Sequence, residues 1–304
     1  MGTLRGKNFR ILNYDSTAQK YKVIGMSTNC SITYTSNTEN AAHKDIVGIA
    51  QVPTVVSQSC NISVESLNVA DVAAMLTAIK SLTPFTLVWD ETSTSDNQTA
   101  LGAAFARTGQ FFLNDCTFQF DDRTNATKQL QFTSTGAVTT LDSAVTVETI
   151  ATGAFTKGQN VRLFLSSDNT AAPAAVIAAC KQMSLHVSLT MESATTKDTT
   201  GEWDVQEPTA LNYDISTTAL VRSGDTITSA VAGKGLPEIE TIYLNGTPVK
   251  WKIANTSGAN NRTASSTICS GSCLLTSLQI SAQNRQNATY TAQMQGYGEY
   301  NVGN

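Results

Sequence analysis

Charge is scarce in this sequence of 304 residues. Charged side chains make up 14% of the residues, aromatic side chains 7%, and the formal net charge is −4. This balance gives no general attraction to nucleic acid or to anionic lipid. The sequence has no run of 18 apolar residues that could span a membrane. Its start has no apolar segment typical of a signal peptide. We therefore expect no membrane partner.

Histidine is almost absent, since His43 and His186 are the only two. A histidine-based triad or multi-histidine metal site therefore has little to draw on. The spacing Cys269-x-x-x-Cys273 resembles half of a zinc site, but no second pair completes it. No glycine-rich phosphate loop follows a strand. The sequence predicts no enzyme activity, catalytic residue, metal or cofactor, and both histidines are interpreted as polar surface. The six cysteines are interpreted as reduced thiols of a cytoplasmic product.

What the sequence does contain is a repeated loop. Glu39, Lys44, Asp45 and Gly48 return with the same spacing 153 positions later (192 − 39 = 153). The second set is Glu192, Lys197, Asp198 and Gly201. Each set lies between two alternating segments, so each is predicted to be the loop of a long β-hairpin.

Further matches hold nearly the same register along the chain. Gly6-x-Asn8-x-Arg10 returns as Gly158-x-Asn160-x-Arg162, and Leu87-x-Trp89 resembles Val249-x-Trp251. Arg123-x-Asn125-Ala-Thr returns as Arg285-x-Asn287-Ala-Thr, where the offset has grown to 162 (285 − 123 = 162). These matches predict a tandem duplication with halves at 1–145 and 146–304.

Each half is predicted to be mainly β. Strands are expected near residues 9–12, 21–26, 30–35, 55–65, 85–89, 101–107, 111–120 and 128–133. One helix is expected between Asn68 and Pro84, with a stripe of Val69, Val72, Ala73, Leu76 and Ile79. A shorter second helix is expected around 225–232, and Asn245-Gly246 is interpreted as a tight turn. The predicted class is a β-barrel or sandwich with a long hairpin and a flanking helix, made twice.

Strand parity divides each hairpin into an apolar and a polar face. The polar face of the first comprises Asn29, Ser31, Thr33, Thr35, Ser57, Ser59, Asn61, Ser63 and Glu65. That of the second comprises His186, Ser188, Thr190, Asn212, Asp214, Ser216 and Thr218. Neither face contains lysine or arginine. A solvated sheet face usually includes lysine, so this pattern favours a surface that does not hold phosphate.

The joint pattern resembles the tail tube proteins of long-tailed bacteriophages: a hairpin with an acidic residue and Lys-Asp…Gly in its loop, then a helix and more strands. Trp203 after the second loop fits this pattern, whereas the first copy has Ala50 there. The resemblance implies rings stacked into a hollow tube in the virion tail, assembled in the bacterial cytoplasm. The polar faces would line the lumen, and loops 36–52 and 189–206 would reach the next ring.

A tandem copy resembles the tube proteins in which three chains supply six domains (3 × 2 = 6). The implied partners are further copies of the chain in homotrimeric rings, then tape-measure, tail-tip and tail-terminator proteins. Double-stranded DNA would pass through transiently and without sequence specificity. Two alternatives stay open: a tail-tip hub or adaptor of the same fold, and a secreted β-rich adhesin.

Overall fold

The computed structural model is mainly β, as the sequence predicts. It describes residues 6, 9–15, 20–24, 27–40, 52–67, 72–91, 106–141, 147, 156–199, 201–221, 233–257 and 263–303. The first half contains β1 (Phe9–Asp15), β2 (Lys20–Val23), β3 (Ser27–Asn40), β4 (Pro53–Leu67), α1 (Val72–Ser81), β5 (Phe85–Glu91), β6 (Arg107–Asp121), β7 (Thr127–Ser134) and β8 (Thr139–Thr140). The second contains the 3₁₀ turn η2 (Gly158–Asn160), β9 (Val161–Leu165), β10 (Ala175–Ile177), β11 (Cys180–Ser193), β12 (Gln206–Leu220), β13 (Gly233–Lys234), α2 (Leu236–Asn245), β14 (Val249–Ser257), β15 (Thr263–Ser281) and β16 (Thr289–Val302).

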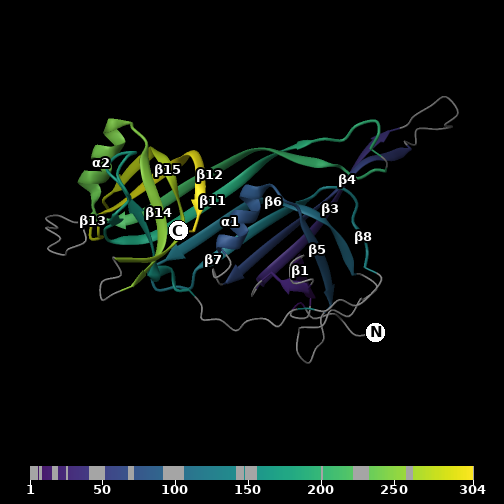
Figure 1. Cartoon of the computed structure of the whole chain (residues 1–304), viewed down its shortest axis with the longest axis horizontal. Coiled ribbons are helices and arrows are strands. Elements are labelled where there is room, and N and C mark those ends of the chain that lie inside the picture. The colour runs from purple at the N-terminus through teal and green to yellow at the C-terminus, as the bar shows by residue number, and fades with distance from the viewer. Residues whose placement is uncertain are drawn as a thin grey trace.

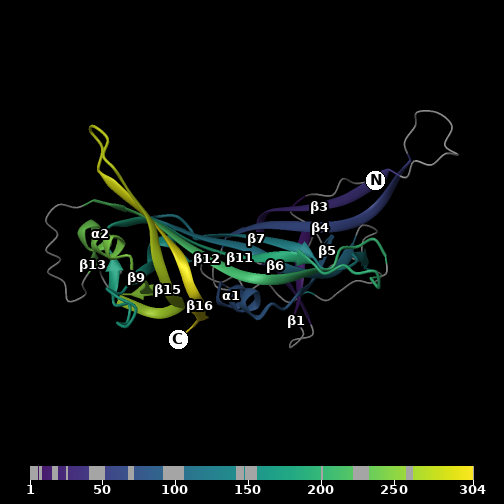
Figure 2. The ribbon, with the colours of Figure 1, turned by 90° about the horizontal axis from the view of Figure 1, so that it is seen from above.

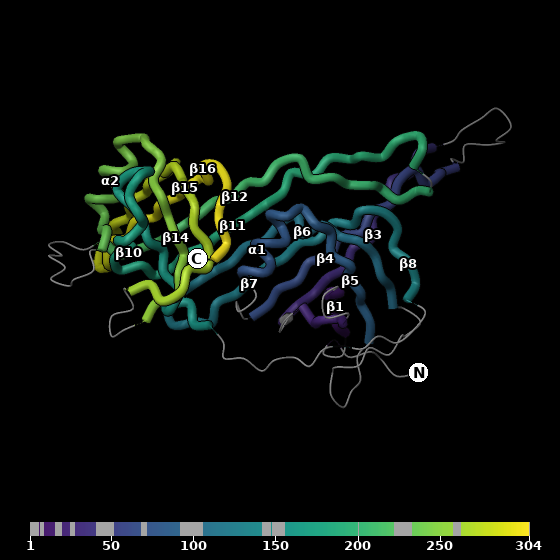
Figure 3. Tube along the Cα trace, viewed as in Figure 1, coloured from purple at the N-terminus to yellow at the C-terminus, as the bar shows by residue number. Residues whose placement is uncertain are grey.

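Eight of the strands form one continuous layer. Its order is β3-β4-β7-β6-β11-β12-β16-β15, and every neighbouring pair is antiparallel. The central pair joins β6 of the first half to β11 of the second, so the layer crosses between the halves. Figure 3 shows β11 and β12 running from the second half past α1 towards the first.

The long strands β6 and β15 each belong to two parts of the sheet. The N-terminal part of β6 pairs with β5, and its C-terminal part pairs with β11 along the same edge. In the second half β15 pairs with β14 over residues 263–273 and with β16 over residues 269–281. The shorter strands β1, β2 and β5 thereby form a side branch in the first half, as β9, β10 and β14 do in the second (Figure 1).

One hydrophobic core serves both halves. The same buried cluster contains Leu76 of α1, Phe118 of β6, Leu185 of β11 and Tyr300 of β16. Figure 2 shows α1 on one side of the long layer. The helix buries Val72, Leu76 and Ile79, as its stripe predicts, but Ala73 is exposed and Met75 is buried in its place. Asn68 and Val69 lie outside the described residues.

A second helix, α2, covers Leu236–Asn245. The stretch 225–232, where the sequence predicts the shorter second helix, lies outside the described residues. The Glu238 carboxylate accepts a hydrogen bond from the Gly235 N–H at 2.9 Å, which satisfies one of the free donors at the helix start. Gly246, at φ 60°, ends the helix in the left-handed region. The Asn245-Gly246 pair is thus a helix end, and interpreting it as a tight turn was wrong.

Most predicted strands of the first half are present with longer bounds. The segment predicted as a strand at 101–107 is an exception, because 101–105 lie outside the described residues and Arg107 begins β6. The hairpins extend further than alternation indicated, since Asn40 and Ser193 still belong to β3 and β11.

The strand pairing of the first half recurs in the second. Every pair between β3 and β4 has a counterpart 153 residues later between β11 and β12, and the irregularities after Asn37 and Thr190 coincide. The pairing of Asn61 with Thr133 likewise has its counterpart in Asp214 with Gln295.

The recurrence also revises one sequence match. Phe85 pairs with Phe111, and the corresponding partner of Cys273 (111 + 162 = 273) is Val249. Val249 is therefore the equivalent of Phe85, at an offset of 164. At the same offset the equivalent of Trp89 is Ile253 (89 + 164 = 253), and their partners Ile11 and Leu163 are also equivalent. The match of Leu87-x-Trp89 with Val249-x-Trp251 is two residues out of register.

Candidate functional site: the polar face of the long layer

The long layer is amphipathic because its strands alternate. On the side towards α1, Cys60, Ile62 and Val64 of β4 are buried, as are Leu185 and Val187 of β11. None of the sixteen residues predicted for the two polar hairpin faces is buried. Asn29, Ser31, Thr33 and Thr35 lie on β3; Ser57, Ser59, Asn61, Ser63 and Glu65 on β4; His186, Ser188 and Thr190 on β11; Asn212, Asp214, Ser216 and Thr218 on β12.

Strand register brings these residues together in rows across the layer. One row passes from Asn29 through Glu65, Gln129, Thr117, His186 and Asp214 to Gln295. The next passes from Ser31 through Ser63, Gln131, Asp115 and Ser188 to Asn212. The two hairpins therefore contribute to one polar surface, here called the polar face.

Strands β6, β7 and β16 complete the polar face, and the sequence analysis left them out. Asp115, Thr117 and Gln119 alternate with buried Cys116, Phe118 and Phe120. That alternation was readable in the sequence. What was not readable was that β6 and β7 lie between the two hairpins, because that requires long-range pairing.

His186 lies between two carboxylates on the polar face. Its Nε2 is 2.7 Å from Asp115 Oδ2, and its Nδ1 is 3.8 Å from Asp214 Oδ2. The three side chains come from β6, β11 and β12, so this contact ties the two halves together at the surface. His186 is thus a specific partner of two acids, not merely polar surface as predicted.

Cations are nearly absent from the eight strands. Within their described residues the lysines and arginines are Arg107, Lys128 and Lys181. Lys128 is 1% exposed and lies on the opposite side of β7 from Gln129, whereas Arg107 and Lys181 lie at strand starts. Four acids, Glu65, Asp115, Asp121 and Asp214, lie on the polar face. The face is consequently neutral to acidic.

The predicted loops 36–52 and 189–206 are too wide, because β3 continues to Asn40, β11 to Ser193, and β12 begins at Gln206. Glu39 and Glu192 are exposed at strand ends, and Lys197 and Asp198 are exposed in a turn. Lys44, Asp45 and Gly48 lie outside the described residues, and Gly201 adopts φ 93°.

The returning arm of the second loop contacts the first half. Gln58 donates its N–H to Glu202 O at 2.6 Å, and Asp204 donates to Gln58 O at 2.9 Å. Trp203 packs against the common core between these two contacts. These bonds fix the end of the β11–β12 hairpin beside β4, and Figure 1 shows both hairpins ending at the same side of the molecule.

Both ends of the long layer carry exposed apolar side chains. Among the described strands β3 pairs with β4 alone, and Tyr34 on it is 53% exposed. At the other end, Ile280 of β15 is 52% exposed. Open strand edges with exposed apolar residues are surfaces on which another chain can pair.

Other kinds of site find no support in the part of the chain that the structure describes. No group of histidine, cysteine, aspartate and glutamate side chains there could hold a metal ion. Neither helix is long and apolar enough to cross a membrane. All six cysteines are free, and Cys269 and Cys273 are buried in the core.

These features define a class: a mainly β structural protein with one long amphipathic layer, whose end strands β3 and, beyond Cys273, β15 have an unpaired edge among the described residues. Residues 156–302 match the family model described as phage tail tube protein. This half of the chain belongs to that family, and the protein is a structural component of the phage tail tube in the virion. The resemblance to phage tail tube proteins is thereby confirmed.

Three solved structures resemble about half of the chain. The tail of an empty gene transfer agent particle has 14% identity over 48% of this chain and 97% of that chain, with a TM-score of 0.37. The SPP1 tail tube has 19% identity over 48% and 77%, with a TM-score of 0.37. The native gene transfer agent virion has 13% identity over 46% and 99%, with a TM-score of 0.37. No curated protein matches the chain.

Proposed function

We propose that three copies of this chain close into one ring of the tail tube, and that each copy contributes two tandem versions of one domain. The halves are residues 1–145 and 146–304. The recurring strand register supports the duplication, because two unrelated domains have no reason to share every pair and irregularity of a long hairpin. Two unlike halves fill a ring of six positions as three chains joined through heterologous contacts.

The contact between β6 and β11 carries this proposal. It already joins one half to the next within the chain, for example through Leu185 opposite Phe118. The equivalent of Leu185 in the first half is Ile32 (185 − 153), and the equivalent of Phe118 in the second half is Ile280 (118 + 162). The same contact between two copies would therefore pair Ile32 of one copy with Ile280 of the next. Tyr34 and Ile280, both exposed in the single chain, would then lie at the same apolar contact. Pairing β3 with β15 would satisfy both open edges at once.

A ring closed in this way would have a polar bore. Three layers of eight strands give 24 strands (3 × 8 = 24). At about 4.8 Å per strand and a tilt of about 40°, such a barrel has a backbone radius of roughly 24 Å. That is wide enough to admit a DNA duplex beside the lining side chains. The polar face would line the bore, and its acids would repel the phosphates that cations would hold.

The loops would make the contacts between stacked rings. Lys197 and Asp198 are exposed beyond the β11–β12 hairpin, on the side where the β3–β4 hairpin also ends. The tape-measure, tail-tip and tail-terminator proteins are the further partners that this role requires, and they would meet the column of rings inside it and at its ends.

A cysteine pair across the proposed joint tests the ring. Thr33→Cys with Gln279→Cys occupies the position that His186 and Thr117 hold within the chain (186 − 153 = 33; 117 + 162 = 279). Oxidised tubes should give covalent species ending at three chains on a non-reducing gel. The matched pair Gln119→Cys with Ser184→Cys should cross-link only within each chain. A ladder ending at six chains would overturn the proposal.

A further inference from the structure

The helix α1 spans the joint between the two halves. The Tyr300 hydroxyl on β16 donates a hydrogen bond to Leu76 O of α1 at 2.7 Å. The Lys80 ammonium, one turn further along α1, donates to Tyr300 O at 2.8 Å and lies 3.2 Å from Glu299 Oε2. The C-terminal turn of α1 therefore packs against the end of β16 in the other half.

The helix α2 repeats α1 at an offset of 164. Thr77 donates its hydroxyl to Ala73 O, and Thr241 donates to Pro237 O, both at 2.8 Å. Each helix covers ten residues and is followed by a residue with positive φ and then by Thr-Pro. In the single chain α2 contacts β13 and β15 of its own half, whereas α1 contacts β6 of its own half and β15 and β16 of the other. The contacts of α1 thus show where such a helix packs when a further half lies beside it.

The end of β16 likewise has an equivalent in the first half. The pairing of Arg107 with Thr140 recurs as the pairing of Cys269 with Val302, at an offset of 162 for both residues. The offset between β7 and β16 therefore holds to the end of β16, which the segment 135–140 repeats in the first half.

The equivalent residues are apolar where the joint within the chain carries charges. The ion pair of Lys80 with Glu299 corresponds to Leu244 (80 + 164 = 244) and Ala137 (299 − 162 = 137). Both members of the pair therefore differ in the same direction. The equivalent of the tyrosine that follows the glutamate is Val138, which is also shorter. Three shorter apolar side chains would let a helix approach the strand more closely than α1 does.

These apolar equivalents are exposed in the single chain. Leu244 is 74% exposed, and Ala137 and Val56 are exposed as well. Val56 is the equivalent of Thr209 (209 − 153 = 56), which lines a cavity of about 580 Å³ together with both members of the ion pair. Polar surroundings at the joint within the chain thus correspond to apolar residues on two separate surfaces. Exposed apolar surface of this kind marks interaction sites.

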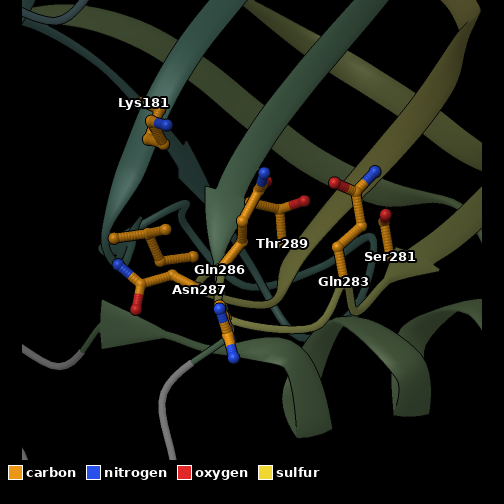
Figure 4. Close-up of a pocket in the computed structure, with 8 residues that line it drawn as sticks. Lys181, Ser281, Gln283, Gln286, Asn287 and Thr289 are labelled. Carbon is orange, nitrogen blue, oxygen red and sulfur yellow. The ribbon is translucent and has the colours of Figure 1, made fainter.

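The cavity at the β15–β16 turn differs in character. It measures about 410 Å³, and most side chains that line it are polar, Lys181, Gln283 and Asn287 among them (Figure 4). Water can satisfy polar groups in an isolated subunit, whereas exposed leucine and valine gain free energy when they are covered. The apolar surfaces around Leu244 and Val56 therefore predict a partner more strongly than this cavity does.

We infer that the C-terminal turn of α2 in one copy packs on the neighbouring copy, with Leu244 against Ala137 and Val56 of that neighbour. This inference rests on the proposed ring, in which β15 of one copy pairs with β3 of the next. Within the chain, α1 belongs to the half that supplies β6 and reaches the half that supplies β11. In the ring, α2 belongs to the half that supplies β15 and reaches the half that supplies β3. The partner is thus a second copy of this chain.

A pair of charge substitutions tests the contact. Leu244→Lys should leave the isolated subunit folded with an unchanged Tm, because this side chain is exposed there. It should lower the yield of rings in analytical ultracentrifugation by roughly tenfold or more, because the lysine would lose water against an apolar surface. Ala137→Glu should act in the same way. The two substitutions together should restore the rings, since they recreate between copies the ion pair of Lys80 with Glu299.

Thr241→Lys provides the matched control, because it adds the same charge to α2. Its equivalent Thr77 stays exposed although α1 spans a joint, so this variant should form rings normally. Normal rings from Leu244→Lys, or no recovery when Ala137→Glu is added, would overturn the inference.

The cysteine pair Thr33→Cys with Gln279→Cys separates this inference from the ring proposal. The pair should give the covalent three-chain species in the otherwise unaltered chain, lose it with Leu244→Lys, and regain it when Ala137→Glu is added. An undiminished three-chain species with Leu244→Lys would leave the ring standing and refute the contact of α2. Its absence from the otherwise unaltered chain would refute the ring itself.

Discussion

At the scale of single residues, the main property of the polar face is that it lacks lysine and arginine in its interior rows. Ser59 and Ser216 lie on it, paired with Thr35 and Ser184, and Lys128 is turned away into the core. Each lysine in a bore would add a phosphate contact, and the contact would repeat at every ring along the tube. The absence of cations therefore matters more in a repeated lining than on a single surface.

Adding lysines tests this directly. Ser59→Lys with Ser216→Lys should change the free energy of unfolding by no more than about 0.5 kcal/mol, because both sites are surface positions. DNA ejection from particles carrying the variant should slow, and more so at low salt, where charges are screened less. Ala74→Lys, exposed on α1 on the other side of the layer, provides a control with one added charge. Equal ejection rates at all salt concentrations would contradict a neutral-to-acidic bore.

The cysteines make a second prediction at this scale. Burial raises the pKa of the Cys60 and Cys273 thiols to about 12, from an ordinary value near 9. The folded state therefore keeps protons that the unfolded state releases. The stabilisation is fully present below about pH 9 and is lost as the pH rises towards 12. Alkaline titration followed by circular dichroism should show this loss, and thiol reagents at pH 8 should spare both residues until the chain unfolds. Rapid native labelling of Cys60 would contradict it.

Alternation in the sequence was sufficient to assign side chains to faces, because strand parity is a local property. It placed all sixteen hairpin residues on the unburied side and Ile62 on the buried side. The comparison of the two halves failed at Trp89 and Trp251. These two tryptophans were aligned because they are the same residue type, but strand pairing shows that they are not equivalent positions. Pairing is fixed by the partner strand, which no local window contains.

At the scale of elements, the helix α1 joins the two halves. Tyr300 of β16 is 1% exposed and donates its hydroxyl to Leu76 O of α1 at 2.7 Å. Lys80 of α1 in turn donates to Tyr300 O at 2.8 Å. A helix of the first half is thereby held to the last strand of the second.

Removing the Tyr300 hydroxyl should weaken this contact. Tyr300→Phe should lower the free energy of unfolding by about 1 kcal/mol, because the buried hydrogen bond to Leu76 O is lost. Urea titration measures the change. Tyr297→Phe, at a residue that is 57% exposed, should change it by no more than about 0.5 kcal/mol. Equal effects of the two substitutions would mean that the hydrogen bond contributes nothing.

The start of α2 carries signals that the sequence analysis did not use. A second helix was expected around residues 225–232, which lie outside the described residues, whereas the start of α2 is marked by Pro237 and Glu238. Those signals were present, but Asn245-Gly246 is also typical of a tight turn, and only the preceding residues decide between the two.

At the scale of the whole molecule, the shared core makes the halves interdependent. Leu185 and Tyr300 of the second half belong to the same buried cluster as Leu76 of the first. We expect one cooperative thermal transition by calorimetry, with equal calorimetric and van't Hoff enthalpies. Each half expressed alone should expose part of this core and bind a hydrophobic dye. Two separate transitions in the full chain would show that the halves fold independently.

The joint between β6 and β11 would also determine how the proposed ring of three chains comes apart. Half of the six joints in that ring would lie inside single chains and survive any dilution, because the two strands remain covalently tethered. Only the other three can dissociate. Partial disassembly would thus release species with two or four domains, never one, three or five. Native mass spectrometry of diluted rings would see only even numbers of domains.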